Sequence, residues 1–224
     1  MRLAAALCLL LPAIPVASPI VFDGYEAYYA TLSDRLFEAK TAVELEAYSL
    51  EGSESAHFRW AGIAQGQRHV VEIRKGALSI DGHVLRLRSA RVFPSETATD
   101  EDLGRGSVAY VATGWMCVEN VPASASGTAV RHKSVYLVRL GQAKLQAWKL
   151  PSLFASCLGI RRRDGQVRFD KVEYRYSEGH DTPAGVVFKD YEIRSDKTFA
   201  STGLERVASF LEPENVYRFS LDVR

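Results

Sequence analysis

Alternating apolar and polar residues recur along most of the chain, and this pattern predicts β-strands. It is most regular at the C-terminus, where Tyr217, Phe219, Leu221 and Val223 alternate with polar residues. Successive side chains of a strand point to opposite faces, so this spacing gives a strand with one apolar face that must dock on a sheet. The other strands that we expect include segments 41–50, 56–64, 107–119, 134–140, 145–151 and 184–193.

Two Asp-Gly pairs predict tight hairpin turns, at Asp81–Gly82 and at Asp164–Gly165. Both central positions of such a turn need positive φ, which Asp and Gly tolerate better than most residues. The first turn folds segment 70–87 into a hairpin and sets Leu78 opposite Leu85. The second turn joins the strand ending at residue 163 to the one that follows residue 165.

The alternation changes phase after the second of these turns. Val167 and Phe169 occupy odd positions, whereas the next apolar residues, from Val172 to Tyr176, occupy even ones. One extra residue near Asp170–Lys171 would bring all of them to the same face of the sheet. The sequence therefore predicts a β-bulge at this point.

Two segments carry a capping-box pattern, in which a polar residue precedes Glu by three positions. The first is Asp23–Glu26, with Asp23 as the expected N-cap of a helix whose tyrosines and leucines share a face; a tyrosine-rich strand is the alternative. The second is Thr202–Glu205, where apolar residues at helical spacing from Leu204 to Leu211 predict a helix that ends before Pro213.

These elements place the chain in the mainly β class. We expect nine to eleven strands, arranged as an antiparallel sandwich or as a strongly curved barrel-like sheet, with one or two short helices. No alternation of strands and helices is present, which argues against a parallel doubly wound sheet. The length after residue 18 suits a single β-rich exported domain, residues 19–224.

Residues 1–18 have the features of a secretory signal peptide. Arg2 supplies the positive start, an apolar run follows from Leu3 to Leu11, and small residues stand at Ala17 and Ser18. The run is too short to span a bilayer, which needs roughly 20 residues. Cys8 lacks the motif for lipid attachment. We therefore expect a soluble exported protein, with a buried N-terminal helix as the alternative for these residues.

Removal of the signal peptide leaves two cysteines, Cys117 and Cys157. In an oxidising compartment they predict one disulfide, which would join their two strands. A reactive thiol at Cys117 is the alternative. No CxxC spacing or other metal-binding motif is present, so we expect no metal and no cofactor.

Composition indicates the compartment and excludes one class of partner. Arginine outnumbers lysine by 20 to 8 and only two asparagines are present, a bias typical of GC-rich genomes. A periplasmic or secreted protein of a Gram-negative bacterium is the best reading. Lys and Arg total 28 and Asp and Glu total 27. A protein this close to neutral has no long-range field to attract nucleic acid.

The segment GIRRRDGQVR places four arginines, Arg161, Arg162, Arg163 and Arg168, at one hairpin end. Guanidinium groups suit carboxylates and phosphates, and arginine is enriched at protein interfaces. We take these four residues as the candidate partner-binding site, with a merely solvated turn as the alternative. The segment 131–133 would add to the cluster if its loop folds alongside.

Signs of catalysis are few. No nucleophile elbow and no glycine-rich phosphate loop is present. His180, in a loop before Pro183, could act as a general base with Asp181, Asp170 or Glu178, although a polar turn accounts for it equally well. The acidic loop 94–107 matches no calcium motif and is read as solvated.

The sequence thus favours a periplasmic, non-catalytic binding protein, most specifically an inhibitor or immunity-type partner of a cell-envelope enzyme. The expected partner is another envelope protein, and no transmembrane segment is expected after residue 18. Two alternatives stay open: a hydrolase that uses His180, and an envelope assembly factor that binds a lipid or a glycan between sheets. The oligomeric state is left open.

Overall fold

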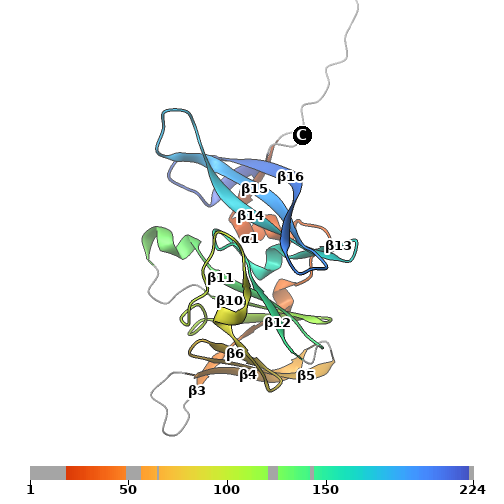
Figure 1. The fold of residues 1–224 in the computed structure, drawn as a ribbon. Coiled ribbons are helices and arrows are strands. Elements are labelled where there is room, and N and C mark those ends of the chain that lie inside the picture. The colour runs from red at the N-terminus through yellow and green to blue at the C-terminus, as the bar shows by residue number, and fades with distance from the viewer. Residues whose placement is uncertain (1–18, 49–56, 65, 121–125, 142–143, 222–224) are drawn as a thin grey trace, which may run out of the picture.

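The computed structural model describes residues 19–48, 57–64, 66–120, 126–141 and 144–221. Three β-sheets, here called sheets A, B and C, are stacked as layers, with sheet B in the middle (Figure 1). The predicted mainly β class is confirmed. The described residues form seventeen strands, more than the nine to eleven expected. The predicted signal peptide, residues 1–18, lies outside the described residues.

The centre of sheet B is buried on both faces, which explains the continuous apolar runs in its central strands. Met116 and Val118 of one strand face the core shared with sheet C, whereas Cys117 between them faces the core shared with sheet A. All neighbours in this sheet are antiparallel except the last pair, β12 and β8. In order, the strands are β2 (Ala42–Glu44), β9 (Val108–Ala112), β10 (Trp115–Asn120), β11 (Ser134–Arg139), β12 (Gln146–Lys149) and β8 (Arg91–Val92).

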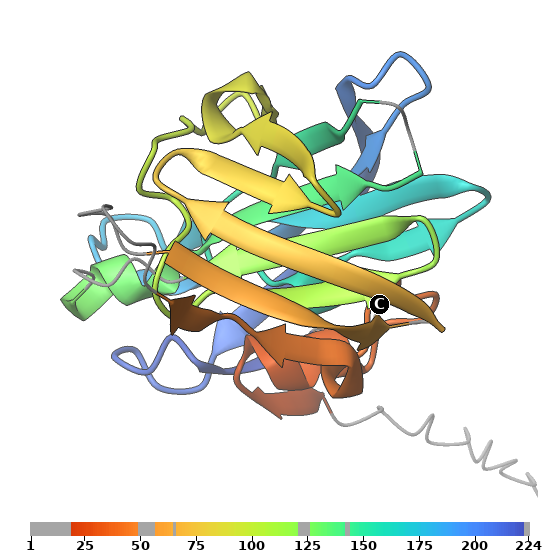
Figure 2. The ribbon, with the colours of Figure 1, turned by 90° about the horizontal axis from the view of Figure 1, so that it is seen from below.

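Sheet C covers one face of sheet B, as Figure 2 shows from below. Its hairpin at Asp81–Gly82 has the predicted register, with Leu78 opposite Leu85. Both turn residues have positive φ, 52° and 83°, as the turn requires. The antiparallel strands are, in order, β3 (Glu46–Tyr48), β4 (His57–Ala64), β5 (Gln67–Arg74), β6 (Ala77–Ile80) and β7 (His83–Arg86).

Sheet A covers the other face of sheet B and curls around the helix α1 (Figure 1). The rings of Tyr28 and Phe188 lie 4.4 Å apart, and those of Tyr25 and Phe219 lie 4.9 Å apart, so the helix packs on the inner face of this sheet. The antiparallel strands are, in order, β1 (Ile20–Asp23), β17 (Arg218–Leu221), β16 (Phe199–Phe210), β15 (Pro183–Ile193), β14 (Gln166–Tyr176) and β13 (Arg161–Arg163).

The first predicted helix is present but shorter and differently capped. It spans Tyr25–Ala30, and Gly24 rather than Asp23 is its N-cap, with no side-chain hydrogen bond. Gly24 has φ of 101°, which a residue with a Cβ adopts at a cost. Four short 3₁₀-helices complete the elements: η1 (Ala39–Thr41), η2 (Leu87–Ser89), η3 (Gly127–Arg131) and η4 (Cys157–Gly159).

Cys117 and Cys157 form the predicted disulfide, and both are fully buried. Only Cys117 lies on a strand, β10; Cys157 begins the 3₁₀-helix η4, so the expectation of two joined strands is wrong for the second cysteine. The bond therefore ties the middle sheet to the segment that leads into β13.

Two predicted single strands are each divided in two. Segment 107–119 turns at Thr113–Gly114, because Gly114 has φ of 75° and allows a hairpin between β9 and β10. Segment 41–50 gives β2 in sheet B and β3 in sheet C, so the chain crosses between layers at Leu45. Both segments read as single strands because their apolar content barely changes across the break.

The predicted helix at Thr202–Leu211 is wrong, because these residues belong mostly to β16. Glu205 pairs with Lys189 and Ser201 with Tyr191, so residues 202–204 stand opposite the single residue Asp190. This wide bulge shifts the phase of the strand and interrupts its alternation. Leu204 is 58% exposed, which shows that no helical apolar face is buried here.

The predicted bulge at Asp170–Lys171 is also misplaced. The pairing of β14 with β15 is regular from Val167 to Arg175 and shifts only between Arg175 and Tyr176. The nearest irregularity is on the next strand pair, at Asp190, which is the cross-strand neighbour of Asp170. Because the pairing is regular, Phe169 and Val172 point to opposite faces of sheet A, and both are buried, so the change of phase marks a change of the buried face rather than a bulge.

Candidate functional site

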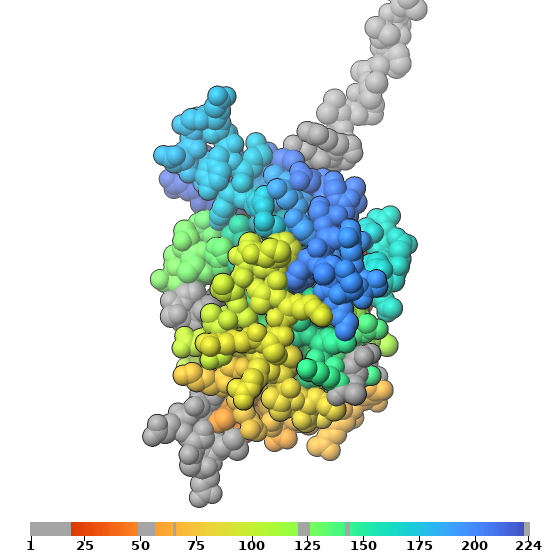
Figure 3. Space-filling model, in the orientation of Figure 1, coloured from red at the N-terminus to blue at the C-terminus, as the bar shows by residue number. Residues whose placement is uncertain are grey.

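The hairpin formed by β13 and β14, residues 161–168, is called the arginine hairpin below. Its turn residues Asp164 and Gly165 have φ of 52° and 78°, so the second predicted Asp-Gly turn is confirmed. Arg161 pairs across the hairpin with Arg168, which brings their side chains to the same face of sheet A. Figure 3 shows this hairpin at the edge of the molecular surface.

The structure divides the four arginines of this hairpin into two kinds. Arg161 and Arg168 are mostly buried, with side chains 13% and 19% exposed. Arg162 and Arg163 are exposed. The ion pair of Arg163 is a weak one, since Asp164 lies 3.9 Å away and both side chains are solvated. The exposed pair is thus open to a partner, whereas the buried pair is engaged within the fold.

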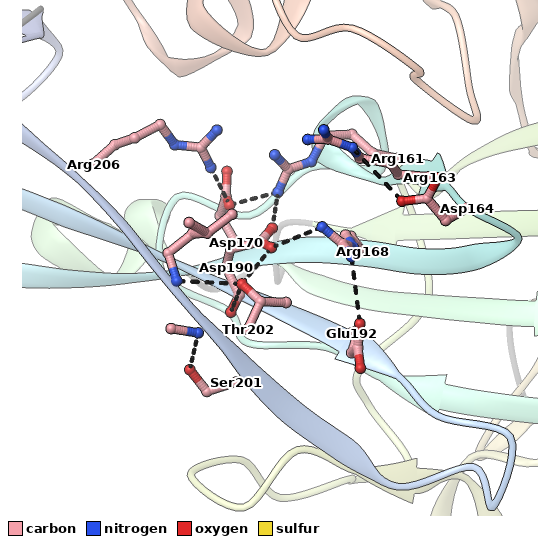
Figure 4. Close-up of polar contacts among 12 residues, drawn as sticks. Arg161, Arg163, Asp164, Arg168, Asp170, Asp190, Glu192, Ser201, Thr202 and Arg206 are labelled. Atoms are coloured by element: carbon pink, nitrogen blue, oxygen red, sulfur yellow. Dashed lines mark hydrogen bonds and ion pairs between the residues drawn. The ribbon is translucent and has the colours of Figure 1, made fainter. Parts of the chain in front are cut away.

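Two buried carboxylates, those of Asp170 and Asp190, hold the inner arginines (Figure 4). Nη2 of Arg161 lies 2.7 Å from Oδ1 of Asp170 and 2.6 Å from Oδ1 of Asp190. Arg206 on β16 also donates to Asp170. Arg168 approaches Asp190 at 3.8 Å. Three guanidinium groups therefore surround what we call the Asp pair.

The wide bulge of β16 contributes a further donor to this cluster. Thr202 lies in the bulge, and its hydroxyl donates to Oδ2 of Asp190 at 2.7 Å. Burial raises the pKa of Asp170 above its ordinary value; Arg161 and Arg206 oppose this shift, and Asp190 adds to it. The irregular strand thus serves to satisfy a carboxylate that the sheet has buried.

A cavity of about 220 Å³ opens beside the Asp pair. The Nε atoms of Arg161 and Arg168 have no hydrogen-bond partner among the described residues. These two atoms are buried, so the cavity offers its arginine lining rather than free Nε donors, and such a lining suits a carboxylate or a phosphate group. Its charged lining consists of four arginines and three carboxylates: Arg161, Arg163, Arg168, Arg206, Asp34, Asp190 and Glu205.

Segment 131–133 does not join the arginine hairpin. Nη1 of Arg131 donates to the hydroxyl of Tyr174 at 2.8 Å, and Lys133 pairs with Glu119 at 3.1 Å. These two cations line a separate cavity at the other end of α1. The expectation that the loop would enlarge the arginine cluster is therefore wrong.

The acidic loop 94–107 is not simply solvated, because it supplies a buried charge. Asp102 is buried and lies 2.7 Å from Nζ of Lys149, with Thr99 and Tyr136 as further donors. Sequence reasoning missed this pair, although a lysine inside the apolar segment LQAWKLP was a signal for it. Within the described residues, no three His, Cys, Asp or Glu side chains are grouped to hold a metal ion.

His180 and Asp181 are exposed in the loop between β14 and β15. The His180 side chain makes no hydrogen bond or ion pair to a carboxylate within the part of the chain that the structure describes. Asp170, one of its three candidate partners, is instead bound by Arg161 and Arg206. The structure thus brings together the arginines and two aspartates, but not a histidine with an orienting acid.

No family model, curated protein or solved structure matches the chain. None of the helices in the described residues is long and apolar enough to cross a membrane. The geometry of the arginine hairpin and the chemistry of its surroundings are therefore the basis on which a function can be inferred.

Proposed function

We propose that the protein is a non-catalytic binding protein of the bacterial cell envelope, periplasmic or secreted, which recognises an acidic surface of another envelope protein. The supporting observation is the arginine hairpin, where Arg162 and Arg163 are exposed beside a cavity lined by four arginines. An inhibitor or immunity-type partner of an envelope enzyme would use such a surface. The buried disulfide is compatible with an extracytoplasmic location.

Rigidity is the second argument for recognition by this hairpin. Its base is fixed by the contacts of Arg161 with both members of the Asp pair. A preorganised surface loses less conformational entropy on binding, so more of the interaction energy appears as affinity. Charge complementarity would also accelerate encounter with an acidic partner and make the association rate depend on salt.

Reversing the two exposed charges is expected to weaken binding of the partner by about tenfold or more, mainly through a slower association rate. The immobilised protein is used to recover partners from periplasmic extract at near-stoichiometric amounts. The affinity of the partner is then measured for the Arg162→Glu/Arg163→Glu variant. Where the partner is an enzyme, its inhibition is measured alongside.

A matched variant, Arg68→Glu/Arg86→Glu, changes the net charge equally on β5 and β7 of sheet C. It should bind like the parent protein, and both variants should keep the parent's melting temperature. Equal loss in the two variants would indicate a non-specific charge effect and would contradict the proposal. So would recovery of no stoichiometric partner, or unchanged affinity after charge reversal at residues 162 and 163.

A further inference from the structure

The cavity at the other end of α1, called the aromatic pocket below, is distinct from the arginine hairpin. It has a volume of about 230 Å³ and lies between the start of the helix, Tyr217 just before β17, and segments 130–133 and 154–156. Tyr25, Phe154 and Tyr217 give it an aromatic wall. Tyr217 is 43% exposed, so this wall reaches the surface.

Phe154 is held in an unusual conformation at the base of this pocket. Its φ of 50° lies in the left-handed region, which costs a bulky residue about 1–3 kcal/mol. Residues in this conformation cluster at active sites and ligand-binding sites. Its backbone N–H donates to the backbone carbonyl of Arg131 at 2.7 Å, and its own carbonyl accepts from the Tyr29 hydroxyl at 2.8 Å. These bonds fix the Phe154 ring against Tyr25, with ring centroids 3.9 Å apart.

The rim of the pocket carries one cation whose charge is not matched. Lys133 is neutralised by Glu119 at 3.1 Å and approaches Glu26 at 3.5 Å. Arg131, in contrast, makes no ion pair among the described residues, and its side chain donates only to the neutral Tyr174 hydroxyl. An anionic group on a bound molecule would supply the missing charge and accept a charge-assisted hydrogen bond.

Two exposed carboxylates, Asp23 and Glu26, also line the pocket. Carboxylates accept hydrogen bonds from hydroxyl groups, so the rim suits a molecule that has hydroxyl donors as well as one anion. A cavity of about 150 Å³ holds a benzene ring, so this one accommodates a single ring with substituents. The C–H groups of a sugar ring carry slight positive charge and pack favourably on the negative face of an aromatic ring.

We propose that the aromatic pocket binds a single carboxylate-bearing sugar unit. The sugar ring lies against the wall of Tyr25, Phe154 and Tyr217, and its carboxylate meets Arg131. Its hydroxyl groups donate to Asp23 and Glu26. An acyl chain or an aromatic acid would offer no hydroxyl donors to the two carboxylates.

The proposal is tested by titrating the full exported protein with glucuronate, galacturonate, glucose and benzoate at constant ionic strength, followed by NMR chemical shifts. Saturable binding is expected for at least one of the two uronates, at about tenfold or more higher affinity than for glucose. Arg131→Gln should remove most of this preference while leaving the weak binding of glucose unchanged. Tyr217→Ala should weaken the binding of both sugars.

Two control variants, Arg194→Gln and Tyr176→Ala, replace exposed residues outside the pocket. They should bind uronate like the parent protein. Absence of saturable binding by both uronates, equal affinity for uronate and glucose, tighter binding of benzoate, or a preference that survives Arg131→Gln would each overturn the proposal. Tyr217 is partly exposed, so the Tyr217→Ala variant is expected to fold even if Arg131→Gln does not. Unchanged uronate binding by Tyr217→Ala would also contradict the proposal.

Discussion

Replacing Cys117 and Cys157 together with alanine should lower the free energy of unfolding by about 4 kcal/mol. The disulfide closes a loop with a sequence separation of 40 residues, and the figure is the loss of chain entropy in the unfolded state that such a loop implies. Few single changes in a domain of this size reach this value. The midpoint and slope of denaturant unfolding measure it directly.

Reductant provides the control for this prediction. Adding dithiothreitol during unfolding should destabilise the parent protein by a similar amount and leave the Cys117→Ala/Cys157→Ala variant unchanged. Comparing the two separates the cross-link from the packing lost with the two sulfur atoms, which are fully buried. A parent protein whose unfolding midpoint does not respond to reductant would contradict the prediction.

Loss of the disulfide is expected to affect both proposed binding sites, because the disulfide joins segments of the chain that lead to each of them. Backbone N–H of Cys157 donates to Glu119 at 2.6 Å, and Glu119 in turn pairs with Lys133 on the rim of the aromatic pocket. Three residues beyond the 3₁₀-helix η4, the chain has entered β13 and reached Arg162. One covalent bond thus fixes the chain that leads to each site.

Local features of the chain were predictable where a single interaction decides them. The Asp-Gly turns require positive φ at both residues, and the hairpin at Asp81–Gly82 consequently has the expected register. The disulfide was predictable from the two cysteines after residue 18 together with the expectation of an oxidising compartment. The spacing of apolar residues also predicted the short helix that begins at Tyr25, but the sequence did not predict its N-cap correctly.

The layering of the sheets could not be read from local pattern. A strand buried on both faces, such as β11, has no alternation and resembles a buried helix segment of the same length. Segment 199–210 was misread for a related reason, because its two extra residues opposite Asp190 become visible only once β15 and β16 are paired. Tertiary pairing, not propensity, decides both cases.

The candidate site shows the same limit. The cluster of arginines was visible in the sequence, but their separation into exposed and buried members was not. It depends on Asp170 and Asp190, which lie 20 positions apart and become neighbours only through the register of β14 with β15. No local signal distinguishes these two aspartates, because each stands beside a lysine in a strand that carries several charged residues.

Removing the inner arginine, by Arg161→Met, should destabilise the fold by about 3–5 kcal/mol at pH 7. The side chain is 13% exposed and bridges two buried carboxylates, so its loss leaves their charges largely uncompensated. Arg163→Met on the same hairpin should change stability by less than about 0.5 kcal/mol, because that side chain is 63% exposed. Denaturant unfolding of both variants measures the difference.

The destabilisation by Arg161→Met should shrink as the pH falls. Burial already raises the pKa of Asp170 in the folded protein, and Arg161 opposes that shift, so the variant raises this pKa further. A carboxyl group whose pKa is higher in the folded state than in the unfolded state favours folding when it is protonated in both states, that is, below its unfolded-state pKa of about 3.9. This contribution to stability is lost as the pH rises through the folded-state pKa. The difference in unfolding free energy between variant and parent is therefore largest at pH values above the folded-state pKa of Asp170 in the variant, and it decreases below that pKa.

A second substitution distinguishes this electrostatic origin from a packing defect. Asp170→Asn in the Arg161→Met background removes one of the two charges and should recover part of the lost stability at pH 7, with little effect at pH 4. A packing defect would give a loss that does not depend on pH and no recovery in the double variant. A loss that does not depend on pH, with no recovery in the double variant, would show that the Asp pair tolerates burial without Arg161, and that Arg206 and Thr202 suffice to hold it.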